Sequence, residues 1–132
     1  MSQENVDAVA AGVRAYNDGD LDAMLAVLAK DAELVPVRSL VEGGSYRGHE
    51  GLRRLLAEMG EEWARFEIHP DAYREIGDCV LLLAHFELRG RASGVEASAP
   101  AAWVCECRGG KITRIRAYSD QEEALGVLGL GE

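Results

Sequence analysis

The sequence predicts an α+β fold, in which a group of helices is followed by a run of antiparallel strands. Two observations lead to this class. Apolar residues recur with helical spacing as far as Glu62, and they alternate every second residue from Trp63 onward. Turn-forming residues then divide the second half at Gly77-Asp78, at 92–96 and at Gly109-Gly110. Because 132 residues is the length of one ordinary domain, we expect residues 1–132 to fold as a single unit.

Helices are expected over most of the first half. The first begins at Ser2 as N-cap, ends at Asn17-Asp18-Gly19, and buries one stripe: Val6, Val9, Ala10, Val13 and Tyr16. Asp20 caps a second helix with apolar positions at Leu21, Met24, Leu25 and Leu28. A short extended piece over 33–37 contains Pro36, which favours a sheet edge. A glycine-rich loop over 41–48 leads to a third helix over 50–62.

Four antiparallel strands are expected next, approximately over 64–75, 79–90, 97–108 and 111–119. Asp120 then caps a last helical turn or two, which returns Leu125 and Leu128 to the core. In the last hairpin, two strand faces carry almost no group suited to chemistry: Ala101, Trp103, Cys105 and Cys107 on one strand, and Thr113, Ile115, Ala117 and Ser119 on the other. If this face lines a pocket, the pocket is hydrophobic.

The strand over 79–90 is apolar on both faces, although a sheet with helices on one side should expose the other face to water. The simplest explanation is a homodimer through the outer sheet face, at Leu81, Leu83, Val104 and Tyr118. The alternative is a few tolerated surface hydrophobes.

Composition excludes several classes of function. The hydrophobic fraction of 48% and charged fraction of 28% are typical of a globular protein, and no apolar run is long enough for a membrane span. A net charge of −9 argues against nucleic acid as a partner. The N-terminus shows no secretory signal, so we expect a cytoplasmic protein that does not bind membranes. We expect no cofactor and no metal, because no histidine has a Cys or His partner at a ligand spacing.

Four motifs together resemble the nuclear transport factor 2-like superfamily, and within it the SnoaL-like group of polyketide-cyclase-like and ketosteroid-isomerase-like domains. They are Asn17-Asp18-Gly19-Asp20-Leu21-Asp22-Ala23, Tyr46-Arg47-Gly48-His49-Glu50-Gly51-Leu52, Gly77-Asp78 and Gly109-Gly110-Lys111-Ile112. The resemblance implies a cone, in which N-terminal helices pack in the concave face of a strongly bent, mixed, mainly antiparallel sheet. It also implies a cavity inside the cone and, in many members, a dimer through the outer sheet face.

The resemblance also implies where catalytic groups would stand, and this chain has apolar residues at those positions. The carboxylate base of isomerase-like members matches Val35, before Pro36, and their protonated Asp matches Trp103. The His and Asp pair of cyclase-like members matches Trp103 and Ala117. The Asp-Arg-Asp set of epoxide-hydrolase-like members matches Ala84, Phe86 and Ala117.

The expected pocket lining combines these positions with their neighbours on the inward faces: Tyr16, Val35, Ala84, Phe86, Trp103, Cys105, Ile115, Ala117 and Ser119. A non-standard acid/base site is an alternative, with Glu33, Tyr46 and His49 as weak candidates. Glu33 shares the strand face of Val35. His85 is expected on the surface beside Glu87, and His69 has no evident partner.

Three functions remain open. The favoured one is a protein that binds a hydrophobic or polycyclic small molecule in the cone. The second is an isomerase, cyclase or dehydratase with a non-standard site. The third is a dimeric structural or protein-interaction module whose cone is filled by its own side chains. The sequence names neither a ligand nor a reaction.

Overall fold

A computed structural model describes residues 2–36 and 45–129. Along the chain the elements are α1 (Ser2–Asp18), α2 (Leu21–Val27), β1 (Leu28–Val35), β2 (Tyr46–Arg47), α4 (Gly48–Glu62), β3 (Trp63–Ile76), β4 (Cys79–Gly90), β5 (Glu96–Arg108), β6 (Lys111–Tyr118) and α5 (Gln121–Val127). The α+β class is confirmed, and the expected helices and strands follow one another as predicted, but the two-residue strand β2 lies where a loop was expected. Residue 37 of the expected first strand and residues 41–44 of the expected loop lie outside the described residues.

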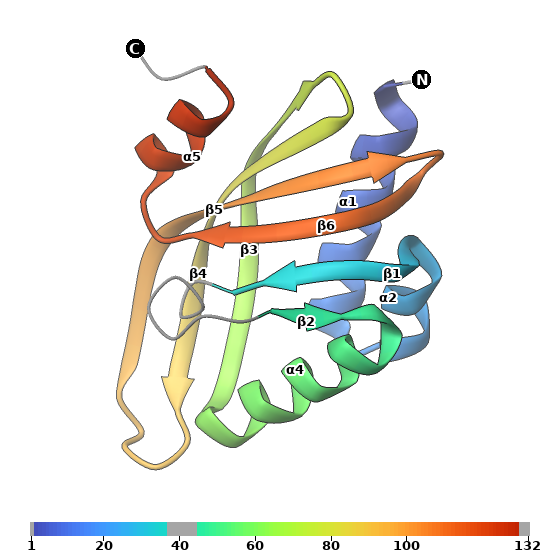
Figure 1. Cartoon of the computed structure of the whole chain (residues 1–132). Helices are drawn as coiled ribbons and strands as arrows, with labels where there is room; N and C mark the ends of the chain where they lie inside the picture. Colours follow the sequence, from blue (N-terminus) through green and yellow to red (C-terminus); the bar gives the residue numbers. More distant parts are fainter. Residues whose placement is uncertain (1, 37–44, 130–132) are drawn as a thin grey trace.

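The strands form one open, six-stranded sheet in the order β2-β1-β6-β5-β4-β3. Only β1 and β6 pair in parallel, and the other neighbours are antiparallel. Figure 1 shows the sheet curving around α1, with α4 running beside β2 and α5 lying apart from the other helices. The expected cone, a bent and mainly antiparallel sheet around the N-terminal helices, is therefore confirmed.

The main core lies on the concave face of this sheet. Its buried members come from α1, β1, β2, α4, β4, β5 and β6, and include Val9, Leu34, Val80, Leu82 and Cys105. Burying such side chains is worth roughly 1.5–3 kcal/mol each, so this face supplies most of the stability that positions the helices. Within the described residues, no helix is long and apolar enough to cross a membrane.

The second helix is shorter than its apolar spacing predicts. It ends at Val27, and Leu28 begins β1, where it pairs with Ile112 of β6 instead of continuing the helical stripe. Lys111 donates a hydrogen bond to the carbonyl of Ala26 at this junction. Tertiary pairing with β6 thus overrides a local pattern that suits a helix equally well.

Register also differs from the prediction at β1. Leu34 pairs with Ile115 and joins the core, whereas Val35 pairs with Arg116 on the outer face. The expectation that Val35 faces the cavity is therefore wrong by one residue. A one-residue shift has this effect because successive strand residues point to opposite faces.

The outer sheet face carries a second core that the chain covers by itself. Leu81 (0% exposed), Val104 and Tyr118 are buried together with Ala102 and with Ala124 of α5. Leu83, Leu125 and Leu128 pack against this cluster. Three of the four residues that suggested a dimer, Leu81, Val104 and Tyr118, are thus buried in a cluster that includes Ala124 of α5. The start of α5 is capped as predicted, because Asp120 Oδ1 accepts a hydrogen bond from Glu122 N at 2.9 Å.

Candidate functional site

A row of aromatic rings joins the N-terminal helix to the concave face of the sheet. The ring centroid of Phe66 of β3 lies 5.2 Å from that of Phe86 of β4, and the two rings are stacked. The centroid of the Tyr16 ring of α1 lies 6.2 Å from that of Phe66, in an edge-on arrangement. Trp63, at the start of β3, is tilted against Phe66 at 6.4 Å. These separations are those of favourable aromatic pairs, so the row is a defined surface rather than a loose set of side chains.

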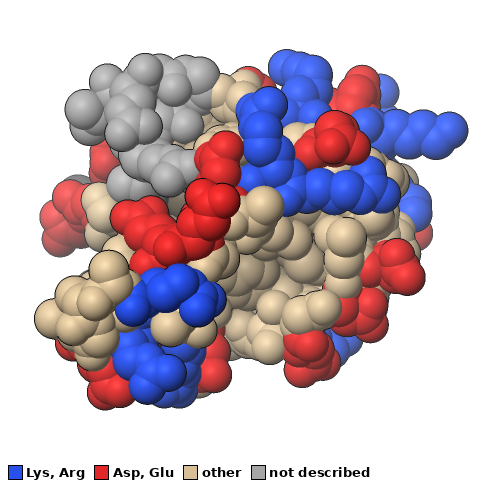
Figure 2. Space-filling view, turned by 90° about the horizontal axis from the view of Figure 1, so that it is seen from below, with Lys and Arg blue, Asp and Glu red and all other residues tan. Residues whose placement is uncertain are grey.

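The row borders an open cleft of about 450 Å³ between the helices and the start of β3. The lining is mainly apolar: Tyr16, Gly19, Leu21, Met24, Leu56, Met59, Gly60, Trp63, Ala64, Arg65, Phe66 and Arg91. Figure 2, which looks at the molecule from below, shows uncharged side chains in a hollow with basic and acidic groups around it. The volume of the cleft lies within the range of small-molecule sites, but the cleft is open to solvent rather than enclosed.

The two arginines of the cleft are already engaged by the protein. Arg91 donates from Nε to the carbonyl of Gly60 at 2.7 Å, and so ties the β4–β5 connection to the end of α4. Arg65 forms ion pairs with Glu67 and Glu87. Arg65 is thus paired with carboxylates, and Arg91 is held by backbone carbonyls.

Tyr16 is the polar group that remains for a ligand. Burial raises the pKa of its phenol to about 12. The hydroxyl therefore stays protonated at any physiological pH, and within the described part of the chain it forms no hydrogen bond. Tyr16, which the sequence predicts in the lining of the cone, borders this cleft. A neutral phenol here is a hydrogen-bond donor for a carbonyl or hydroxyl oxygen.

Deeper in the cone, the sheet places the family-matched positions other than Val35 on one face. Trp103 pairs directly with Ala117, and Cys105 with Ile115. Ala84 and Cys105 are fully buried, whereas Phe86, Trp103, Ile115 and Ala117 are half-buried. Ser119 is exposed beyond the end of β6. An indole and a methyl group thus stand side by side where an acid/base pair would be needed.

The last hairpin contains a bulge that the alternation in the sequence does not reveal. Cys107 pairs with Ile112 while Glu106 pairs with Arg114, so Thr113 is the extra residue. Its hydroxyl donates to the carbonyl of Glu106 at 3.1 Å. Ile112 takes the core position opposite Cys107.

Glu33, one candidate acid/base residue, lies on the outer face and is held by arginines. Arg114 Nε donates to its carboxylate at 2.9 Å, and Arg47 lies 3.9 Å away. The hydrogen bond from Arg114, with one from Ser45, lowers the pKa of Glu33. A carboxylate stabilised in this way is a poor general base.

Tyr46 and His49 are bound to other groups. The Tyr46 hydroxyl donates to Glu58, and Arg54 lies over the ring at 4.6 Å. His49 Nε2 donates to the carbonyl of Leu28 at 3.1 Å, so this nitrogen carries the proton. Tyr46 pairs with Leu34 on the inward face, opposite to Glu33. The structure therefore does not bring the three candidates together.

The three cysteines are free thiols. Cys105 and Cys107 are buried and Cys79 is half-buried. Burial raises the pKa of all three, that of Cys107 to about 11. Because the thiolate is the reactive form, none of them is suited to nucleophilic catalysis at neutral pH.

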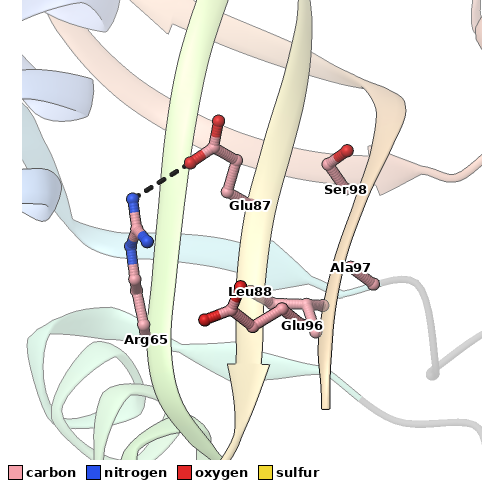
Figure 3. A pocket seen from close by; sticks show the side chains of 6 residues that line it. All are labelled: Arg65, Glu87, Leu88, Glu96, Ala97 and Ser98. Carbon is pink, nitrogen blue, oxygen red and sulfur yellow. Dashed lines mark hydrogen bonds and ion pairs between the residues drawn. The ribbon is translucent and has the colours of Figure 1, made fainter.

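A second pocket, of about 340 Å³, lies against β3, β4 and β5 and is lined by Arg65, Glu87, Leu88, Glu96, Ala97 and Ser98. Figure 3 shows Arg65 and Glu87 joined by an ion pair, with Glu96 and Ser98 coming from β5. Next to this pocket, His69 stacks on His85 at 5.1 Å. The sequence did not reveal this group, because its members meet only through the pairing of β3 with β4.

Known proteins with the same architecture were found by sequence and by structure. A family model described as a SnoaL-like domain matches residues 9–115. An NTF2-like protein of unknown function from Burkholderia pseudomallei is 21% identical, with a TM-score of 0.82 and coverage of 97% of this chain and 98% of that one. No curated protein matches.

Two further solved structures have relevant descriptions. TerC, co-crystallised with polyporic acid, is 23% identical, with a TM-score of 0.81 and coverage of 96% of this chain and 98% of that one. A putative polyketide cyclase from Xanthomonas campestris is also 23% identical, with a TM-score of 0.80 and the same coverage. At these identities the likeness establishes the fold.

Proposed function

Because the chain belongs to the SnoaL-like domain family, whose model matches most of its length, we propose that it binds a small hydrophobic or polycyclic molecule at the cone. The observation that carries this proposal is the aromatic cleft. It combines a volume of about 450 Å³ with the rings of Tyr16, Trp63 and Phe66. This volume and an aromatic lining support the binding of a drug-sized ligand.

The shape of the cleft favours a flat ligand. Phe66 stacks on Phe86, so an aromatic surface continues from the cleft toward the concave face of the sheet. A fused-ring compound can extend this row by further stacking, and each such contact is worth roughly 0.5–1.5 kcal/mol beyond its area. Met24 and Met59 border the same space and adapt to different outlines. TerC, a structural neighbour, was crystallised with polyporic acid.

The Tyr16 hydroxyl gives the ligand its orientation. The described residues leave this hydroxyl without a hydrogen bond. Because the phenol stays neutral, the hydroxyl can donate a hydrogen bond to the ligand. A carbonyl, quinone or hydroxyl oxygen on the edge of the ring system is the matching acceptor.

A cyclase, isomerase or dehydratase reaction is the alternative, because two structural neighbours are described as putative polyketide cyclases. Its support from this chain is weaker. Glu33 is paired with Arg114 on the outer face, away from Tyr46. Trp103 and Ala117 offer no acid/base pair. Binding without turnover therefore agrees better with the side chains present.

The predicted homodimer stays a prediction. Since Leu81, Val104 and Tyr118 are covered by α5 within one chain, they no longer provide an argument for it. Light scattering at micromolar concentration tests it directly, and a mass of one chain would remove it together with the dimeric-module function.

A titration with a fluorescent polycyclic probe tests the binding proposal. We would follow the emission of the uncharged probe N-phenyl-1-naphthylamine and the quenching of tryptophan emission by a hydroxyanthraquinone. Met59→Lys places a charge in the cleft, and we expect it to weaken both affinities at least tenfold. Val127→Lys makes the same kind of change at an exposed residue of α5 and should leave them unchanged. Equal affinities in the parent and Met59→Lys would contradict the proposal.

The orientation is tested separately. Tyr16→Phe removes the hydroxyl and retains the ring. We expect the hydroxyanthraquinone to bind several-fold more weakly to this variant, and unsubstituted anthracene to bind equally well to both proteins. A loss of the same size for both compounds would show that Tyr16 acts through packing alone.

A further inference from the structure

The outer face of β3 and β4 places like groups directly opposite each other. Glu67 pairs with Glu87, and two residues further along each strand His69 pairs with His85. Opposed carboxylates on neighbouring strands repel each other unless a cation lies between them. In this chain they are half-buried rather than fully solvated, which strengthens the repulsion. The arrangement therefore requires a positive charge.

Arg65 supplies that charge in the structure. Its Nη2 lies 2.9 Å from Glu67 Oε1 and 3.0 Å from Glu87 Oε1. The same two oxygens lie 3.4 and 3.7 Å from His69 Nε2. One imidazole nitrogen and two carboxylate oxygens from adjacent strands thus converge on the place that a side-chain cation occupies.

His69 Nε2 is itself unsatisfied. The atom is buried, and it lacks a hydrogen-bond partner within the described residues although the carboxylates are near. Its ring is held in position by stacking on His85, with 16° between the planes, and His85 Nδ1 lies 3.3 Å from Asp71. A fixed ring nitrogen that faces two carboxylates at 3.4 and 3.7 Å, without a well-formed hydrogen bond to either, is placed as a metal ligand would be.

We propose that Glu67, His69 and Glu87 bind a divalent transition metal ion, with Zn²⁺ as the best fit, and that Arg65 occupies the site in its absence. Ligand atoms at 2.0–2.1 Å from a tetrahedral Zn²⁺ are about 3.3 Å apart. The three atoms here are all within 4.8 Å of one another, and two of the separations are 3.4 and 3.7 Å. Small rotations of these side chains would bring the three ligand atoms to the separations expected around Zn²⁺.

The ligand set selects the class of metal. One imidazole with two carboxylates suits Zn²⁺ and its neighbours Co²⁺ and Ni²⁺, whereas Mg²⁺ and Ca²⁺ prefer oxygen ligands alone. The fourth position of Zn²⁺ is open to water, because Glu87 also borders the pocket of about 340 Å³ in Figure 3. Binding displaces the guanidinium of Arg65 toward solvent, which the 46% exposure of this side chain permits.

The sequence-based expectation of no metal considered only ligand spacing along the chain. Glu67 and His69 are two residues apart on one strand, but the third ligand comes from the neighbouring strand, 18 positions after His69. Only the register between β3 and β4 brings the three together.

Isothermal titration with Zn²⁺ at pH 7.5 tests the proposal, in a Cys79→Ser background so that the accessible thiol does not compete. We expect one ion per chain. His69→Ala and Glu87→Gln should each lower the affinity at least tenfold. Arg65→Gln should raise it several-fold, because it removes the competing cation. Glu96→Gln is the matched control: it removes the same charge from the same pocket, and should change the affinity less than twofold.

Two results would overturn the proposal. One is the absence of Zn²⁺ binding up to millimolar concentration in both the parent and Arg65→Gln. The other is binding that His69→Ala leaves unchanged, which would place the ion elsewhere, for example at His49. Co²⁺ absorption gives a second readout: visible ligand-field bands should appear in the parent and disappear in His69→Ala. Circular dichroism of each variant shows that the fold is retained.

Discussion

The outer apolar cluster should depend on α5 of the same chain, and Leu81→Ala tests this dependence. Leu81 is 0% exposed and lies in a cluster with Val104, Tyr118 and Ala124. The substitution removes three carbon groups at about 0.8 kcal/mol each, or about 2.4 kcal/mol of transfer free energy. A residual cavity of about 30 Å³ adds roughly 0.7 kcal/mol. We therefore expect a loss of about 3 kcal/mol in the free energy of unfolding.

Urea unfolding followed by circular dichroism measures this loss. We expect the same difference between parent and variant at two protein concentrations tenfold apart, because α5 is part of the same chain. Val127→Ala, at an exposed position of α5, should change stability by less than about 0.5 kcal/mol. In a double-mutant cycle, the interaction free energy between Leu81→Ala and Leu128→Ala should exceed about 0.5 kcal/mol. A loss below about 1 kcal/mol, or one that depends on concentration, would refute burial by α5.

Three other substitutions probe separate features. Arg114 holds the pKa of Glu33 below its usual value of 4.5, so the stability that Glu33 provides is present above about pH 4.5 and is lost as the pH falls through the lowered pKa. The free energy of urea unfolding of Glu33→Gln should therefore differ from that of the parent at pH 7 and approach it in acid. A difference that stays constant with pH would contradict this. Burial raises the pKa of Tyr16 to about 12 from 10.0, so parent stability should fall between these pH values and fall less in Tyr16→Phe, as thermal melts at pH 9 and 11 would show. Gly48→Ala brings a Cβ within 2.9 Å of the carbonyl oxygen of Lys30, whereas the Cβ of Gly77→Ala meets open space at a similar positive φ. Calorimetry should therefore show that Gly48→Ala lowers the free energy of unfolding by at least about 1 kcal/mol more than Gly77→Ala. Equal losses would exclude the close contact.

The long strands could be predicted from the sequence because their patterns are local. Alternating apolar residues and the turns at Gly77 and Gly109-Gly110 fix the boundaries of β3 to β6 within a few residues. The start of β1 could not be predicted, because Leu28 suits a helical stripe and a strand equally well. Only its pairing with Ile112 decides between them.

Register limits what the sequence reveals about the site. Helical spacing determines the direction of Tyr16, which borders the cleft, while the cone lining predicted with it stays a prediction. Val35 was misplaced by one residue, since the parallel pairing of β1 with β6 selects Leu34 for the inward face. Similarly, Glu33 has the right chemistry for a base, but Arg114, 81 positions away in the sequence, donates a hydrogen bond to its carboxylate. Such pairings leave no signal in the local pattern.

The two faces of one sheet therefore separate two kinds of chemistry. On the concave face, Trp103 and Ala117 exclude charge, and the aromatic row ends at a phenol that stays neutral. On the outer face, Glu67 and Glu87 concentrate charge that a cation must balance. Because alternate residues of β4 serve the two faces in turn, a substitution such as Phe86→Ala should weaken binding of a polycyclic ligand without changing the affinity for Zn²⁺. Glu87→Gln should have the opposite pair of effects. If one substitution altered both affinities strongly, the two sites would be coupled through the sheet, and the separation argued from strand alternation would be wrong.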